Sequence, residues 1–465
     1  MSKQLIDAVF NRIGLEDYLK GAEDTARWIR SLEKKTDKGS YWVPEKVGDK
    51  EYGRVDMYFG SSGIILFFIS LADASGNADY LDDARRGGDY ILDQFETFGS
   101  DCLNRRQIYL SQYHDGIRWS YTVGGVSGVA YALAELGSAT GDKKYTAAAI
   151  AYTEMIVANA HENEYGLDWG GKSGISFDSG TILYLLYAGK KFERPDFIET
   201  ADKGGHAILT TGLKAKVGTR FMGLRNIVKE MTGIDDVNYD VPNFYYGTSG
   251  IAYTFARLYQ ETKEEAYLTA AREGAAYVAS VAITDGDAAL VPYRIPDKQD
   301  LFYLGNCHGV TGTARLYYLL YDITGEDFYR EWTEKLVNGI EASGAPELRS
   351  PGYWNCYSFC CGTAGFLDLY AALYLKTNDR KWLNLARRSA KVLISEGNLS
   401  MDGFNWHQAF DRTDTDAIST DPGYFSGAAG NADALLQLWF AEHGKAPVFR
   451  QPDEPFVTRK SGRKA

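Results

Sequence analysis

The stretch Gly362 to Leu373 reads GTAGFLDLYAAL, a Gly-x-x-Gly turn that runs directly into an apolar, helix-like segment. Five further segments repeat this form, and a sixth is a degenerate copy. They are GSSGIILFFISL from Gly60, GVSGVAYALAEL from Gly125, FDSGTILYLLY from Phe177 (the degenerate copy), GTSGIAYTFARL from Gly247, GVTGTARLYYLL from Gly309 and GAAGNADALLQL from Gly427. Such regular recurrence indicates one repeating supersecondary unit, and each interval has room for a second helix.

The second helix has its own pattern, an aromatic residue followed four positions later by a small one. A spacing of four places both on one helical face, where small side chains let a neighbouring helix approach closely. The sixth copy, around Phe328, is the weakest. The other copies are Tyr18/Ala22/Ala26, Tyr80/Ala84/Gly88, Tyr145/Ala149, Phe197/Ala201/Gly205, Tyr267/Ala271/Ala275 and Trp382/Ala386/Ala390. The sequence therefore predicts seven helices of each type.

The order of the two helix types predicts a closed ring. The chain begins with the aromatic-small type at Tyr18 and ends with the Gly-x-x-Gly type at Gly427, so the first helix can pair with the last. Closure removes the exposed ends that an open solenoid must cap. We expect an all-α fold, a closed α/α toroid with about seven inner Gly-x-x-Gly helices and seven outer helices. Residues 1–448 would form this single domain, and 449–465 a C-terminal tail.

In such a toroid every inner helix begins at the same end. The free N–H groups and the positive dipole ends of these helices would face a shared basin, and Ser or Thr in the motifs could cap them. We therefore expect the functional site at this end.

Composition restricts the partners. The 50 basic and 62 acidic residues of the 465-residue chain give a net charge of −12, which repels a nucleic-acid backbone. No run approaches 18 apolar residues, and the N-terminal stretch does not resemble a secretory signal, so we expect no transmembrane segment and a cytoplasmic location. The five cysteines are too few and too uneven for a disulfide framework.

Three cysteines fall where the repeats predict chemistry. Cys307 lies two residues before Gly309, while Cys360 and Cys361 directly precede Gly362. The repeat register places these thiols at the starts of two adjacent inner helices. Three soft sulfur donors with one open position are typical of a catalytic zinc site, so we expect one Zn²⁺ per chain. Cys356 could be a fourth ligand that closes the site, and buried cysteines can also be plain packing residues.

These motifs resemble the lanthionine synthetase C-like family of cyclases, in the variety with Cys-Cys-Gly at the second motif where commoner members have Cys-His-Gly. The resemblance covers essentially the whole chain. It implies that zinc binds a cysteine thiolate of a dehydrated precursor peptide, and that this thiolate adds to dehydroalanine or dehydrobutyrine to form a lanthionine-type thioether ring. The chain has no dehydratase domain, which implies a separate dehydratase as partner.

The resemblance also identifies where a proton donor should stand. The family's histidine directly precedes the glycine of the inner helix before the first zinc motif, and Tyr246 holds that place here. Zinc and the helix N-terminus would favour ionised tyrosine and lower its pKa. His308, beside Cys307, is a competing acid. The family's aspartate has two candidates in ambiguous register, Asp168 and Asp178. For both of them, and for His308, helix capping or packing is the alternative interpretation.

Two other functions remain open on the same fold. The missing histidine would suit a non-catalytic protein that binds zinc and a thiol, either glutathione or a Cys-containing peptide. The 33 Tyr and 9 Trp could instead stack sugars in a carbohydrate-active α/α barrel, with Asp168 and Asp178 as an acid/base pair. Bound zinc would distinguish the cyclase and the thiol-binding protein from the carbohydrate-active enzyme. Thioether products would distinguish the cyclase from the thiol-binding protein.

Overall fold

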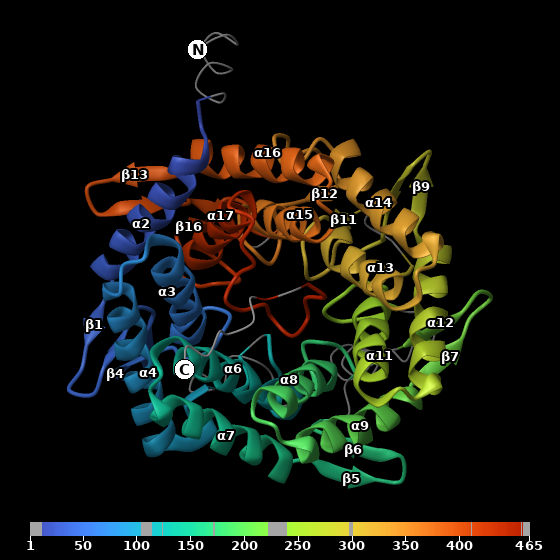
Figure 1. Ribbon diagram of the computed structural model, residues 1–465, viewed down its shortest axis with the longest axis horizontal. Coiled ribbons are helices and arrows are strands. Elements are labelled where there is room, and N and C mark those ends of the chain that lie inside the picture. The colour runs from blue at the N-terminus through green and yellow to red at the C-terminus, as the bar shows by residue number, and fades with distance from the viewer. Residues whose placement is uncertain are drawn as a thin grey trace.

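The computed structural model describes residues 12–103, 114–122, 124–170, 173–221, 240–296, 301–410, 412–456 and 458. Within them, fourteen helices form two concentric rings that alternate along the chain (Figure 1). The inner ring consists of α3 (Ser61–Ser75), α6 (Val126–Thr140), α8 (Asp178–Lys191), α11 (Thr248–Thr262), α13 (Val310–Thr324), α15 (Thr363–Thr377) and α17 (Ala428–Glu442). The outer ring consists of α2 (Leu15–Ser31), α4 (Asp79–Phe98), α7 (Lys143–Ala158), α9 (Pro195–Leu209), α12 (Glu265–Val281), α14 (Asp327–Ala342) and α16 (Arg380–Glu396). The predicted α/α toroid is confirmed.

Six of the seven inner helices begin directly after the first motif glycine, as predicted, and α8 begins after Phe177 of the degenerate copy. At these six glycines the preceding loop packs so tightly that a side chain is excluded: a Cβ on Gly362 would lie 1.7 Å from the carbonyl oxygen of Cys356. Inner helices are buried on nearly every side and only 14 or 15 residues long. No helix in the described part of the chain has the length and apolar character needed to cross a membrane.

The motif hydroxyls do not cap the inner helices as expected. They donate instead to carbonyl oxygens about seven residues earlier, as Ser62 does to Val55 (2.6 Å) and Thr311 to Leu304 (2.5 Å). The geometry of the loop explains the difference, since it folds back over the helix start and brings its carbonyls within reach. Each such bond fixes a loop that leads to the basin.

The aromatic-small face of the outer helices packs inward. Tyr18, Ala22 and Ala26 are all buried, and the same holds for the corresponding residues of the other strong copies. In α14 the position is filled by Tyr329, which is buried, whereas Phe328 is 46% exposed. The weak sixth copy was therefore placed one residue early.

The ring closes between its first and last helices. Helix α2 packs against α17, and α17 also contacts α3 and α15. At this seam a Cβ on Gly21 of α2 would lie 2.8 Å from Ile394 of α16 and 3.5 Å from Leu435 of α17. Figure 1 shows the blue helix α2 beside the red helix α17. The predicted pairing of first and last helices is thus observed.

Short two-stranded sheets, which were not predicted from the sequence, lie in the connections between the helices of the ring. Their strands have two to four residues, too few for a visible alternation of apolar and polar side chains. The pairs are β1 (Lys34–Lys35) with β2 (Ser40–Tyr41), β3 (Pro44–Val47) with β4 (Lys50–Gly53), β5 (His161–Asn163) with β6 (Gly166–Asp168), β7 (Gly212–Lys214) with β8 (Thr219–Phe221), β9 (Ile283–Asp285) with β10 (Ala288–Leu290), β11 (Phe302–Tyr303) with β12 (Tyr353–Trp354), β13 (Asn398–Ser400) with β14 (Gly403–Asn405) and β15 (Gln408–Ala409) with β16 (Ile418–Ser419). The 3₁₀ segment η1 (Gly99–Leu103) and helix α5 (His114–Trp119) complete the described elements.

The segment after α17 differs from the tail that the sequence suggested. Phe449 to Glu454 are buried, and the chain crosses the middle of the ring (Figure 1). The Tyr131 hydroxyl of α6 donates to the carbonyl oxygen of Arg450 at 2.9 Å, and Arg315 of α13 pairs with Asp453 at 3.1 Å. These contacts compensate the charges of the buried segment. In the sequence the same stretch is rich in charged and proline residues, so it resembles an exposed tail and its burial was not predicted. We call residues 449–456 the axial plug.

Candidate metal centre

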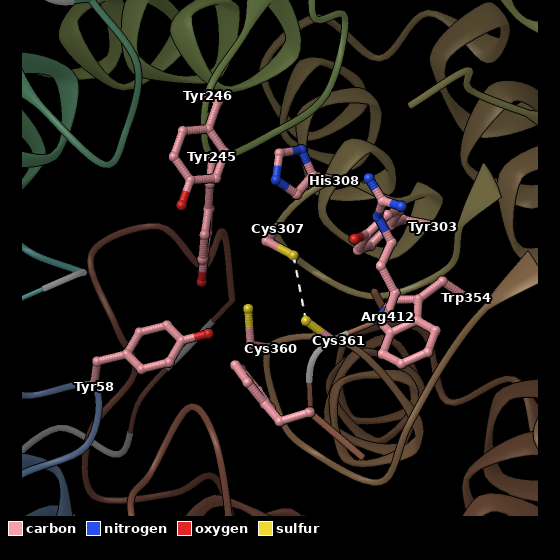
Figure 2. A pocket seen from close by; sticks show the side chains of 11 residues that line it. Tyr58, Tyr245, Tyr246, Tyr303, Cys307, His308, Trp354, Cys360, Cys361 and Arg412 are labelled. Carbon is pink, nitrogen blue, oxygen red and sulfur yellow. Dashed lines mark hydrogen bonds between the residues drawn. The ribbon is translucent and has the colours of Figure 1, made fainter. Parts of the chain in front are cut away.

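Two adjacent loops bring the three predicted cysteines together. One loop leads into α13 and carries Cys307, and the other leads into α15 and carries Cys360 and Cys361. The loops are joined by a hydrogen bond from the Asn306 N–H to the carbonyl oxygen of Cys360 (2.7 Å). Gly305 makes this approach possible, because a Cβ there would lie 2.5 Å from the Cα of Cys361. Figure 2 shows the three sulfurs converging.

The spacing of the sulfurs suits a metal ion. The Cys307 and Cys361 Sγ atoms are 3.6 Å apart, and all three Sγ atoms lie within 4.8 Å of one another. Two sulfurs bound at about 2.3 Å in a tetrahedral zinc site are separated by about 3.8 Å. All three side chains are buried, and none of the described cysteines forms a disulfide. The donor set and its spacing therefore fit a soft divalent cation.

The three thiols strongly affect one another's ionisation. Hydrogen bonds from Cys307 and Cys361 hold the pKa of Cys360 well below its ordinary value, and the Tyr58 hydroxyl contributes in the same direction. The pKa of Cys307 and that of Cys361 are raised well above the ordinary value, chiefly by hydrogen bonds with the neighbouring thiols. The metal-free cluster thus favours a single thiolate, and three thiolates require a cation among them.

Cys356 lies beside the cluster but outside the set of three donors. Its Sγ is 3.1 Å from the Ser358 hydroxyl, and its thiol also hydrogen-bonds with Cys361. Although burial opposes ionisation, these bonds lower the pKa of Cys356. Three thiols therefore converge in the described geometry, and Cys356 contacts one of them, Cys361.

The thiols line a cavity of about 250 Å³ whose walls are largely aromatic (Figure 2). Seven of its residues occupy the last two positions before a motif glycine, so the repeat register itself builds the cavity. These seven are Tyr58, Tyr245, Tyr246, Cys307, His308, Cys360 and Cys361, and the remaining four are Tyr303, Trp354, Phe410 and Arg412.

Tyr246 and His308 both reach this cavity, and their rings stack on each other. The ring centroids are 4.7 Å apart and the planes differ by 11°. The Asn243 amide lies 2.7 Å from Nδ1 of His308 and donates to it, because the other amide atom accepts from the Tyr246 N–H; the histidine proton therefore resides on Nε2. Burial, reinforced by Arg412, lowers the pKa of His308 to about 3. Burial raises the pKa of Tyr246, and the negative charge of the neighbouring cysteine cluster acts in the same direction.

Neither predicted aspartate lines the cavity. Asp168 ends β6 in an outer hairpin, where it accepts from the Asn163 amide at 2.8 Å and lies 3.6 Å from His161. Asp178 is the first residue of α8 and is buried. The structure thus places Asp168 in an outer hairpin and Asp178 at the start of α8, both outside the residues that line the cavity.

The sequence analysis did not single out several cavity residues. Tyr58 and Tyr245 could have been found, because each stands two residues before a motif glycine, the register of Cys307 and Cys360. Phe410 and Arg412 carry no such signal, since they belong to the irregular connection between α16 and α17. Only the folded chain brings that connection to the cavity.

An α/α toroid with a buried three-thiol cluster at the start of its inner helices defines a narrow class of proteins. A family model described as "Lanthionine synthetase C-like protein" matches residues 51–444. The chain therefore belongs to the lanthionine synthetase C-like family, in agreement with the resemblance of its motifs. No curated protein matches the chain by sequence.

A comparison with solved structures supports the same fold through one match, nisin cyclase. Nisin cyclase matches with a TM-score of 0.58 at 14% identity, covering 84% of this chain and 94% of its own. The Lin0763 protein from Listeria innocua matches with a TM-score of 0.46 at 14% identity, covering 73% and 88%. A sugar epimerase from a ruminal bacterium matches with a TM-score of 0.47 at 12% identity, covering 92% and 98%. At such an identity the likeness to nisin cyclase concerns the fold alone, and the two matches with TM-scores below 0.5 carry no argument.

Proposed function

We propose that this protein is a zinc-dependent peptide cyclase that adds a cysteine thiolate to dehydroalanine or dehydrobutyrine and so forms lanthionine-type thioether rings. The observation that carries the proposal is the buried Cys307, Cys360 and Cys361 cluster, which opens on a cavity in a member of the lanthionine synthetase C-like family. Family membership and the likeness to nisin cyclase support a peptide as substrate.

The three cysteines would hold one zinc ion, with the fourth position left to the substrate. Zinc supplies a Lewis acid that ionises an arriving thiol at neutral pH. The aromatic walls, among them Tyr58, Tyr245 and Phe410, exclude water from the reacting sulfur. Since Cys356 is held by Ser358, three protein sulfurs remain for the metal.

Addition of the thiolate leaves an enolate that needs a proton, and we assign its delivery to Tyr246. The hydroxyl is protonated at neutral pH, because burial raises its pKa, and the residue lines the same cavity as the thiols. His308 supports the tyrosine by stacking, and its own ring is neutral at pH 7. A dehydrated precursor peptide from a separate dehydratase, encountered in the reducing cytoplasm, completes the proposal.

The test combines metal analysis with product analysis. The purified protein should contain one zinc per chain, and incubation with a dehydrated precursor peptide should consume one thiol for each ring formed. Because addition leaves the peptide mass unchanged, rings are detected by mass spectrometry after alkylation of the remaining free thiols. A zinc-loaded protein that leaves every thiol alkylatable would exclude the cyclase function.

A second candidate is a zinc-dependent thiol-binding protein that does not close rings, holding glutathione or a Cys-containing peptide. Tyr246 stands at the position where the family has histidine, and this favours the second candidate, because tyrosine is a weaker acid than histidine at neutral pH and slows protonation. Thiol binding without thioether formation in the experiment above would establish this function. The carbohydrate-active alternative gains no support, since Asp168 and Asp178 lie outside the thiol cavity.

A further inference from the structure

Arg412 differs from every other residue that lines the thiol cavity. It is the one permanently charged side chain among the eleven described lining residues, and His308 beside it is neutral at pH 7. Arg412 is therefore a positive charge at the cavity of a chain whose net charge is −12. Among the described residues no carboxylate forms an ion pair with Arg412, and the leading charge effects on its pKa come from Tyr303 and Tyr293.

Aromatic residues hold the guanidinium in place instead. Its central carbon lies 5.3 Å from the centroid of the Tyr293 ring, and the Tyr293 and Tyr303 rings stack with centroids 4.8 Å apart. Although burial favours the neutral form, the hydroxyls of Tyr303 and Tyr293 keep the pKa of Arg412 above its ordinary value. A cation held over aromatic rings is orientated before a ligand arrives.

The surrounding wall is itself fixed by backbone pairing. Strand β11 pairs in parallel with β12, which sets Tyr303 beside Trp354 with ring centroids 6.4 Å apart. Figure 2 shows Arg412 next to Tyr303 and Trp354, on the side of the thiols where His308 lies. The guanidinium is thus half-buried, positioned and without an acidic partner among the described residues.

We propose that Arg412 binds a carboxylate on the substrate that supplies the thiol. Guanidinium groups bind carboxylates through two parallel hydrogen bonds, and partial burial strengthens such charged pairs. Because Arg412 and the three cysteines line one cavity of about 250 Å³, a ligand that reaches both carries its carboxylate only a few bonds from its sulfur. The preferred substrate is therefore a C-terminal cysteine, or a cysteine next to an acidic residue.

This inference rests on the proposed function only in requiring that a thiol enters the cavity. It is independent of ring closure, since it concerns binding alone. The competing explanation is that Arg412 only packs against Tyr293 and stabilises the loop. Only the proposal predicts that the affinity for a ligand depends on the charge of that ligand.

The experiment measures thiol binding to the full-length protein loaded with cobalt(II), followed by the change in cobalt absorption. N-acetylcysteine and N-acetylcysteinamide differ only in carboxylate against carboxamide. A hydrogen-bonded charge contributes about 1.5–3 kcal/mol, so we expect the wild type to bind the acid about 10- to 100-fold more tightly. Arg412→Gln should remove this preference by weakening the acid, and Arg412→Lys should keep part of it.

Arg349→Gln is the matched control. Its guanidinium also lies over a tyrosine ring, 4.4 Å from the centroid of Tyr357, but it does not line the cavity. This variant should retain the full preference. The peptides Ac-Ala-Cys-OH, Ac-Asp-Cys-NH₂ and Ac-Ala-Cys-NH₂ then distinguish a terminal from a side-chain carboxylate.

Equal affinity of the wild type for acid and amide would overturn the proposal, as would a preference that survives in Arg412→Gln or a cobalt-loaded protein that binds neither thiol. Ring formation is measured separately. A carboxylate preference without rings would leave Arg412's role intact and refute the cyclase function, whereas rings without the preference would do the reverse.

Discussion

In four of the seven repeats, the last two positions before the motif glycine supply residues that line the thiol cavity. They place Tyr58, Tyr245, Cys307 and Cys360 at equivalent points of four repeats, all facing one cavity. The backbone at these points is fixed by the glycine that follows and by hydrogen bonds between neighbouring loops, such as that from the Tyr245 N–H to the Cys307 carbonyl oxygen (2.9 Å). A repeat that evolved for packing thus also supplies a ring of functional positions.

The three-donor centre predicts how metal content responds to single substitutions. Cys360→Ala and Cys361→Ala should each lose most of the bound zinc, because two remaining thiols leave the ion too few ligands. Cys356→Ala should retain it, since the Cys356 sulfur is held by Ser358. Elemental analysis of the purified variants measures this. Zinc loss in Cys356→Ala would instead indicate a closed four-thiolate site.

Removal of the hydroxyl oxygen of Tyr246 tests whether this residue is the proton donor. Tyr246→Phe retains the ring that stacks on His308 but removes the hydroxyl, so ring formation should slow by about 10²–10⁴-fold while zinc stays bound. Initial rates by quantitative mass spectrometry give the comparison. His308→Ala is the competing variant, and an unchanged rate in Tyr246→Phe with a large loss in His308→Ala would reassign the donor.

The helices show how far sequence patterns reach. The Gly-x-x-Gly starts and the aromatic-small faces were predictable, because each reflects a local steric need that recurs seven times. The cavity thiols followed from the same register. Arg412 was not predictable, since the connection that carries it has no repeat, and the hairpins were missed because their strands are so short. Phe328 was chosen over Tyr329 because adjacent aromatics leave the register ambiguous until packing selects one.

Closure of the helical ring at α2 gives a prediction at the level of elements. A leucine at Gly21 would collide with Ile394 and Leu435 across the seam, so Gly21→Leu should lower stability in urea by about 1–3 kcal/mol. Gly21→Ala is the matched control, because its added methyl meets only the flexible end of Ile394 and it gains helix propensity. If Gly21→Leu unfolds at the wild-type urea concentration, the seam is not packed as described.

The axial plug, residues 449–456, packs inside the ring of helices. Arg450 donates to Asp368 of α15 at 2.6 Å, and Arg315 pairs with Asp453, with all four side chains buried. The Tyr245 hydroxyl, on the cavity wall, also donates to Asp453 at 3.3 Å. The plug is therefore part of the core, and it connects the core to the candidate site.

Removing the plug should be far more damaging than trimming a terminus. A chain that ends at residue 448 takes Asp453 and Glu454 from Arg315 and takes Arg450 from Asp368, so that Arg315 and Asp368 keep only each other, at 3.6 Å. Removing one partner of a buried ion pair costs about 3–5 kcal/mol. We expect this truncation to melt at a much lower temperature or to fail to fold. A chain that ends at residue 458 keeps every contact described for the plug and should melt as the full chain does. Identical melts for both truncations would contradict the structural role.

The plug also predicts how stability depends on pH. Three carboxylates, those of Asp368, Asp453 and Glu454, share the interior with the guanidiniums of Arg315 and Arg450, so the cluster has one negative charge in excess. Burial, together with the charge of Asp368, raises the pKa of Glu454 to about 8 from an ordinary 4.5. Between these values the folded chain holds a proton that the unfolded chain has lost. This contribution is therefore fully present below about pH 4.5 and is lost as the pH rises through 8.

Glu454→Gln removes the titrating group and should remove its share of the slope, which approaches one proton, or about 1.4 kcal/mol per pH unit. Melting temperatures recorded from pH 6.5 to 9 should fall for the wild type and fall less for this variant. The range begins at 6.5 because burial raises the pKa of Asp433 only to about 6, so its similar effect is largely complete by then. Glu334→Gln, at an exposed ion pair with Arg330, controls for the loss of a carboxylate as such. If the melting temperatures of Glu454→Gln and the wild type fell in parallel over this range, the proton held by the folded chain would reside elsewhere in the cluster. Asp453→Asn would then be the variant that loses the pH dependence, because burial raises the pKa of Asp453 as well.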